Sequence, residues 1–124
     1  MSNNRAEQLN LILEKLQSSS SDIEACAVVS EDGLMIASLL PEGFDEAQLA
    51  AMSAAMMSMG TRISQELNRG ALQQLFVKGD NGYALGMYAG PKAVILALAR
   101  KEAKLGLLFL DLSRTAEEIL KALD

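Results

Sequence analysis

Histidine and tryptophan are absent from the sequence, and cysteine occurs only once, as Cys26. Without histidine, the chain lacks the commonest general base and the commonest metal ligand. A single cysteine can form neither an internal disulfide nor the cysteine pairs of a zinc finger or zinc ribbon. Cys26 lies in an apolar run, so we expect it to be a small buried hydrophobic residue. No GxxxxGK[ST] phosphate loop is present, and we therefore expect no cofactor and no metal.

Aromatic residues are also scarce, at 4% of the chain, so aliphatic side chains, alanine and methionine must fill the core. The composition is otherwise that of a globular protein, with 50% hydrophobic and 22% charged residues. A length of 124 residues predicts a single domain covering 1–124. The net charge of −5 argues against nonspecific nucleic-acid binding, which requires a basic surface.

Targeting signals are not recognisable in the sequence. No apolar segment of the kind found in signal peptides follows the first five residues, Met1–Arg5. The longest charge-free run is too short, and too rich in alanine, serine and glutamine, to cross a bilayer. We therefore expect a cytoplasmic protein without stable membrane insertion.

Hydrophobic periodicity predicts eight secondary-structure elements. Helices are expected where apolar residues recur every three or four positions, and strands where short apolar runs are bounded by turn residues. The all-apolar run at 93–99 predicts a central strand that is covered on both faces. Asp45 is expected to cap the longest helix and Gly70 to end it, whereas Asp80, Asn81 and Gly82 predict a hairpin turn. The expected helices are 4–18, 45–69 and 105–123, and the expected strands are 23–30, 34–40, 72–78, 83–89 and 93–99.

The resulting order, α-β-β-α-β-β-β-α, predicts an α/β sandwich. Hairpins between neighbouring strands imply an antiparallel sheet, and helices before, between and after the strands can cover both of its faces.

The longest helix is unusual because fifteen residues between Glu46 and Arg62 carry no charge. We expect its larger apolar residues to face the core, and its small residues on the opposite side to face a second subunit. The alternative is that alanine is present only because it favours helix. Met57 lies off the predicted core stripe and is an expected partner contact. The core stripe comprises Leu49, Met52, Met56, Met59, Ile63 and Leu67, and the predicted subunit contact comprises Ala47, Ala50, Ala51, Ala54, Ser58 and Thr61.

Candidate catalytic groups all have structural explanations. Asp80 and Asn81 resemble part of a calcium loop, but the remaining ligands of that motif are missing. Arg62 could be read as an arginine finger, although a surface salt bridge is the favoured interpretation. The carboxylate groups at 31–32, 42, 45–46 and 117–118 fall at turns, helix starts or a polar helix face. A basic cluster at 100, 101 and 104 is expected to be a solvated loop.

The sequence resembles the roadblock family, named for a dynein light chain. The resemblance rests on the helix ending Leu13-Glu-Lys-Leu-Gln17, the segment Ala27-Val-Val-Ser-Glu-Asp-Gly-Leu-Met-Ile-Ala37 and the small-residue central helix. The strands at 72–77 and 93–98 follow in family order. The segments Leu105-Gly-Leu-Leu and Ala116-Glu-Glu resemble the extra C-terminal helix of the prokaryotic, MglB-like branch, which includes regulators of cell polarity.

The resemblance implies a five-stranded antiparallel sheet, with the long helix on one face and the terminal helices on the other. It implies a homodimer that pairs through the long helix and the following edge strand. It also implies binding to a Ras-like small GTPase, whose GTP hydrolysis some prokaryotic members of the family stimulate without supplying catalytic side chains. The expected strand contacts are Leu72, Gln73, Gln74, Leu75, Phe76 and Val77, and the expected GTPase contacts are Gln48, Ala55, Met57 and Arg62.

Three functional hypotheses remain open from the sequence. The first is a homodimeric GTPase regulator that stimulates GTP hydrolysis. The second is a dimeric scaffold or adaptor that recruits a GTPase or another protein without changing its rate. The third, an enzyme acting on a small molecule, is disfavoured because no convincing catalytic group is found.

Overall fold

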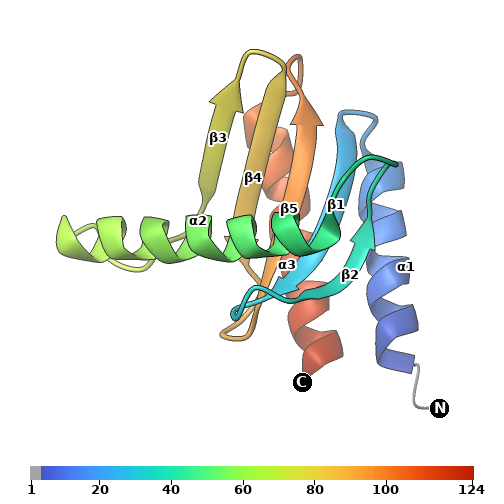
Figure 1. Cartoon of the computed structure of the whole chain (residues 1–124), viewed down its shortest axis with the longest axis horizontal. Helices are drawn as coiled ribbons and strands as arrows, with labels where there is room; N and C mark the ends of the chain where they lie inside the picture. Colours follow the sequence, from blue (N-terminus) through green and yellow to red (C-terminus); the bar gives the residue numbers. More distant parts are fainter. Residues whose placement is uncertain (1–3) are drawn as a thin grey trace.

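The computed structural model describes residues 4–124, so the first three residues of the signal-peptide argument lie outside it. Its element order is the predicted α-β-β-α-β-β-β-α (Figure 1). The helices are α1 (Asn4–Ser19), α2 (Glu46–Glu66) and α3 (Leu105–Leu123). The strands are β1 (Ile23–Ser30), β2 (Met35–Leu39), β3 (Leu75–Gly79), β4 (Gly82–Tyr88) and β5 (Ala93–Arg100).

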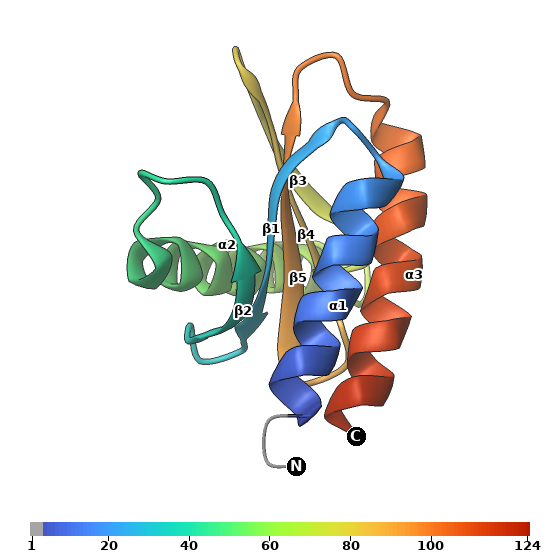
Figure 2. The same ribbon diagram turned by 90° about the vertical axis from the view of Figure 1, so that its right-hand side faces the viewer.

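All five strands form one antiparallel sheet in the order β2-β1-β5-β4-β3. The apolar strand β5 lies at its centre, as predicted, and its positions from Ala93 to Ala97 are all buried. β2 and β3 are the two edge strands. Figure 2 shows the sheet edge-on, with α1 and α3 packed side by side on one face and α2 crossing the other. The predicted fold class is therefore confirmed.

The main core lies between the sheet and the two terminal helices. Leu9 and Leu13 of α1 and Leu112 and Ile119 of α3 are fully buried there, against side chains that include Ile95 of β5. These helices follow the predicted apolar positions closely, with one exception at the end of α3. The apolar periodicity of the sequence predicts that Leu120 shares the core-facing side with Leu112 and Ile119, but Leu120 remains 36% exposed. The sequence periodicity thus located the core-facing sides of both terminal helices.

The boundaries of α2 and β3 differ from the prediction. Asp45 caps α2 as expected, because its side chain accepts a hydrogen bond from the backbone N–H of Gln48 at 3.1 Å. The helix ends at Glu66 rather than running to Arg69, and β3 starts at Leu75 rather than at Leu72. The connection 67–74 is longer than predicted because α2 extends past β3, and the chain must return from the end of the helix to the edge of the sheet (Figure 1).

Candidate interaction surface

Helix α2 contacts the sheet through a narrow row of mostly small residues. Its buried positions are Ala50, Ser53, Met57 and Gly60, which recur every three or four residues and so share one side of the helix. Ser53 has the only polar side chain in this buried row. Its hydroxyl donates a hydrogen bond to the carbonyl of Leu49 at 2.7 Å, so it needs no partner outside the helix. Small side chains allow α2 to lie close to the strands.

The predicted orientation of α2 is therefore wrong. Within the expected core stripe, Met52, Met59, Ile63 and Leu67 are 52–63% exposed. Met57, expected off the stripe, is instead 1% exposed and packs on the sheet. Size and hydrophobicity pointed to the larger residues, but the close approach of helix and sheet selects the smaller ones. The sequence contained one sign of this orientation, which is Gly60. Glycine inside a helix costs about 1 kcal/mol, so its presence indicates that this side of α2 packs closely against another element.

Met57 sits over Gly86 of β4, at the point where α2 crosses that strand. A Cβ atom at Gly86 would lie 2.8 Å from the sulfur of Met57 and 3.2 Å from the Cε of Met56. Glycine at this strand position is thus required by the approach of the helix rather than by backbone conformation.

We expect Gly86→Val to destabilise the protein by roughly 1–3 kcal/mol, because the added methyl groups would push α2 away from the sheet. Gly79→Val is the matched control, since a Cβ at Gly79 in β3 would meet nothing closer than 3.9 Å. Urea unfolding followed by circular dichroism measures the difference. Equal midpoints for the two variants would contradict the close approach.

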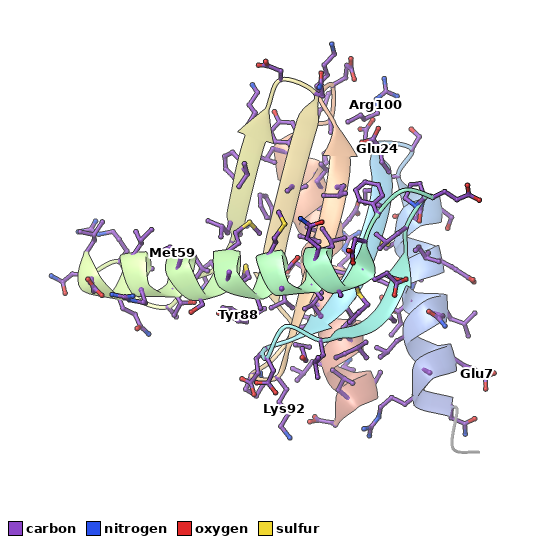
Figure 3. The ribbon with its side chains drawn as sticks, in the orientation of Figure 1. Glu7, Glu24, Met59, Tyr88, Lys92 and Arg100 are labelled. Atoms are coloured by element: carbon purple, nitrogen blue, oxygen red, sulfur yellow. The ribbon has the colours of Figure 1, made fainter. Side chains whose placement is uncertain are left out.

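Tyr88 of β4 adds a polar anchor to the same helix. Its hydroxyl lies 2.9 Å from the Thr61 hydroxyl and 3.3 Å from the Met57 carbonyl, to which it donates. Figure 3 shows Tyr88 on one side of α2 and Met59 on the part of the helix that projects past β3. The position of α2 along the sheet is thereby fixed by both packing and hydrogen bonding.

Helix α2 is longer than the surface that supports it. Its last buried position is Gly60, where an added Cβ would lie 3.1 Å from the side chains of Leu72 and Leu75. Beyond Gly60 no residue of the helix is buried, and this part extends past the edge strand β3 (Figure 1). The overhanging turns still carry Ile63 and Leu67, both more than half exposed.

The exposed apolar side of α2 forms a continuous row, which we call the methionine stripe. It runs along the flank of the helix that faces the uncovered part of the sheet. There an apolar groove of about 330 Å³ separates α2 from side chains of β3, β4 and β5. The stripe comprises the exposed Met52, Met59, Ile63 and Leu67 and the half-buried Leu49 and Met56, and the groove is lined on the sheet side by Val77, Ala84, Leu96 and Leu98.

The edge strand β3 has unpaired backbone groups next to this groove. The N–H of Ala89 donates to the carbonyl of Ala93 at 2.8 Å. Every second residue of β4, counted back from Ala89, therefore directs its backbone groups toward β5, and the residues between them direct theirs toward β3. Given the β4 registers with its two neighbours, the backbone groups of Phe76 and Lys78 point outward, away from β4. The side chains of Phe76 and Val77 are 45% and 54% exposed. An exposed apolar edge strand of this kind is a template for pairing with another strand.

The residues predicted to form the subunit contact fall into different environments. Ala50 is fully buried within the protomer and is not available to a second subunit. Ala54 is half-buried beside Gly33, in the turn between β1 and β2. Leu72, Gln73 and Gln74 precede β3 instead of belonging to it. Of the other positions, Ala47, Ala51, Ser58, Gln73, Gln74, Phe76 and Val77 are exposed, and Thr61, Leu72 and Leu75 are half-buried.

Three of the four predicted GTPase contacts share one line on α2. Gln48, Ala55 and Arg62 are exposed and spaced by seven residues, on the side of the helix that faces away from the sheet. Met57 does not join them, because it is buried. Arg62 forms the expected surface salt bridge, to Glu66 one helical turn later at 3.4 Å. The exposure of this pair makes it a weak contributor to stability.

Cys26 is buried in β1, as predicted, with 1% of its surface exposed. Burial raises the pKa of its thiol to about 12 from a usual value of 9.0, because the thiolate would lose its hydration. The thiol is therefore protonated and shielded at neutral pH.

We expect Cys26 to resist iodoacetamide in the folded protein and to react fully in urea. Below pH 9 the thiol is protonated in both states and stability is unaffected. Above pH 9 the unfolded chain alone loses this proton, so stability should fall until the folded thiol titrates near pH 12. Comparing urea midpoints of the protein and of Cys26→Ala across this range isolates the effect. Rapid alkylation at neutral pH without denaturant would contradict the burial argument.

Neither a metal centre nor a membrane-crossing helix is found in the described part of the chain. Among residues 4–124, no three histidine, cysteine, aspartate or glutamate residues are close enough to hold a metal ion. No helix in that range is long and apolar enough to cross a bilayer. The basic cluster lies at the end of β5 and in the following loop, where Arg100 pairs with Asp22 at 3.7 Å and with Glu102 at 3.2 Å.

The geometry defines a class of protein: a helix–sheet–helix sandwich whose exposed features are an overhanging apolar helix and an open strand edge. The model of the Roadblock/LC7 domain family matches residues 9–99. The chain therefore belongs to the Roadblock/LC7 family.

Comparisons with individual proteins agree with this assignment. The uncharacterized protein MJ1340 of Methanocaldococcus jannaschii is 34% identical over 97 residues, which cover 78% of this chain and 84% of that protein. The structure of Myxococcus xanthus MglB has a TM-score of 0.88 at 17% identity, covering 99% of this chain and 92% of MglB. Another MglB structure, described as having a tetrameric arrangement, has a TM-score of 0.87 at 18% identity and covers 96% and 90% of the two chains. At these identities the structural matches establish the fold.

Proposed function

We propose that the protein is a non-catalytic homodimeric regulator that binds a Ras-like small GTPase and stimulates its GTP hydrolysis. The observation that supports it most is the overhang of α2 beside the open edge of β3. The end of α2 has an apolar surface that does not pack on its own sheet, and β3 has unpaired backbone groups along its free edge. Both face the space that a second copy would occupy.

A two-fold axis beside β3 would cover the apolar overhang of α2 and pair the free backbone groups of β3 at the same time. We call the contact between the two copies along this axis the dimer seam. Antiparallel pairing of two β3 strands joins the sheets, with the backbone groups of Phe76 and Lys78 as hydrogen-bonding partners. Each overhang then reaches over the sheet of the other copy. There the methionine stripe can fill the apolar groove beside Val77 and Ala84, removing an exposed patch that would otherwise contact water.

The GTPase contact is placed on the outer line of the paired helices, at Gln48, Ala55 and Arg62. These residues are exposed in the protomer and lie on the side of α2 that faces away from its own sheet. Family resemblance supplies the nature of this partner. GTP ordering the switch segments of a small GTPase would give the surface a reason to prefer the GTP state.

The alternative proposal is a dimeric scaffold that recruits a GTPase or another protein without changing its rate. The same fold and dimer serve both functions, so kinetics must separate them. The chain is titrated into a GTP-loaded Ras-like GTPase encoded near it, and phosphate release is followed. Acceleration supports the regulator, whereas tight binding with an unchanged rate supports the scaffold. Absence of binding to either nucleotide state contradicts both.

A further inference from the structure

On the other face of the sheet, a second apolar groove follows the same free edge of β3. It has a volume of about 450 Å³ and lies between β3 and the N-terminal half of α3. Phe76 forms one wall, and Phe109 and Leu110 of α3 form the other. Gly106, which has no side chain, and the small residue Ser113 also line it, and a Cβ at Gly106 would meet nothing within 4 Å. The groove is thus open space beside an unpaired strand.

Aromatic residues of one protomer only partly close this groove. The Phe76 ring meets Phe109 edge-on at 6.3 Å between centroids and Tyr83 at 6.2 Å. Phe76 nevertheless remains 45% exposed and Leu110 remains 48% exposed. Edge-on aromatic contacts of this kind stabilise further when another ring completes the cluster.

We infer that Phe76 of a second copy fills this groove, so that α3 forms a second apolar layer of the dimer seam. The inference rests on the proposed pairing through β3. Phe76 and Lys78 alone direct backbone groups outward from this strand, so any antiparallel pairing centred at or next to Phe76 uses them. Side chains that are paired across antiparallel strands lie on the same face. The second Phe76 ring therefore emerges on the α3 side.

The register between the two β3 strands decides which residue lies opposite Phe76, but in each case the second Phe76 ring lies on the α3 side of the sheet. With the axis at Phe76, the two rings lie directly opposite each other, about 5 Å apart at Cβ. With the axis one residue away, the rings are diagonal neighbours at about 7–8 Å, still within reach of aromatic side chains. An axis at Lys78 would place two lysines opposite each other, which is unfavourable.

A tryptophan reporter tests the inference, since the chain contains no tryptophan. Leu110→Trp places one at the rim of the groove, and Leu11→Trp is the matched control on α1, where Leu11 is 63% exposed. Emission of Leu110→Trp should shift to longer wavelength on dilution, over the concentration range in which sedimentation shows dimer becoming monomer. Emission of Leu11→Trp should stay constant, because α1 packs over β1 and β2, away from β3.

Charge at the same position provides a second measurement. Leu110→Glu should raise the dimer dissociation constant on the order of 10-fold, whereas Leu11→Glu should leave it unchanged. Thermal melting confirms that both variants fold. A dimer whose Leu110→Trp emission and Leu110→Glu affinity match those of the controls would overturn the role of α3 while leaving the dimer intact. A protein that is monomeric at every concentration would overturn both.

Discussion

Ile63→Glu is expected to convert the protein from dimer to monomer. Ile63 lies on the overhang of α2, is 52% exposed in the protomer and belongs to the methionine stripe. In the proposed dimer it is buried against the sheet of the second copy, and two-fold symmetry introduces the charge twice. An unpaired buried charge costs about 3 kcal/mol or more, so the dissociation constant should rise by more than about 100-fold. The fold of the protomer should be largely unaffected, because Ile63 is more than half exposed there.

Ser58→Glu is the matched control, and it also separates two views of the helix. Ser58 is exposed on the opposite flank of α2, among the small residues that the sequence suggested as the subunit contact. Light scattering at micromolar concentration compares each mass with the 13.3 kDa monomer. We expect Ser58→Glu to remain dimeric. A monomeric Ser58→Glu beside a dimeric Ile63→Glu would restore the small-residue face as the seam.

The second large effect concerns GTP hydrolysis by the partner. Ile63→Glu should lose stimulation along with dimerisation, because the paired helices form the proposed contact surface. Arg62→Ala removes one proposed contact with the GTPase and should weaken binding, but it should not abolish stimulation. Removing an arginine finger typically lowers the rate by about 10³-fold or more, whereas Arg62 is an exposed side chain paired with Glu66.

Single-turnover phosphate release from a GTP-loaded partner measures both variants, and binding is followed separately by titration. The chain alone should release no phosphate from GTP, since its sequence contains no phosphate loop. If Arg62→Ala bound normally but lost all stimulation, Arg62 would have to be assigned a catalytic role. If GDP and GTP forms of the partner bound equally, the scaffold would be the better description.

The sequence by itself determined the order of elements, the central position of β5 and the inward sides of α1 and α3. These features follow from local patterns: turn residues mark the ends of strands, and a helix covering one large core repeats its apolar residues along one side. The burial of Cys26 was predictable from the apolar run around it. The capping of α2 by Asp45 was predictable because it involves residues only three positions apart.

Only the tertiary structure decided how α2 is rotated. The helix has apolar or small residues over most of its circumference, so periodicity offered two sides that could contact the sheet. Gly86, twenty-six residues after Gly60, admits the helix closely enough for Met57 to pack on β4, and Tyr88 then holds Thr61 at 2.9 Å. These long-range contacts turn the methionine stripe outward and leave the end of α2 beyond β3. Packing at distant positions, rather than hydrophobicity along the helix, therefore sets the surface that a partner would meet.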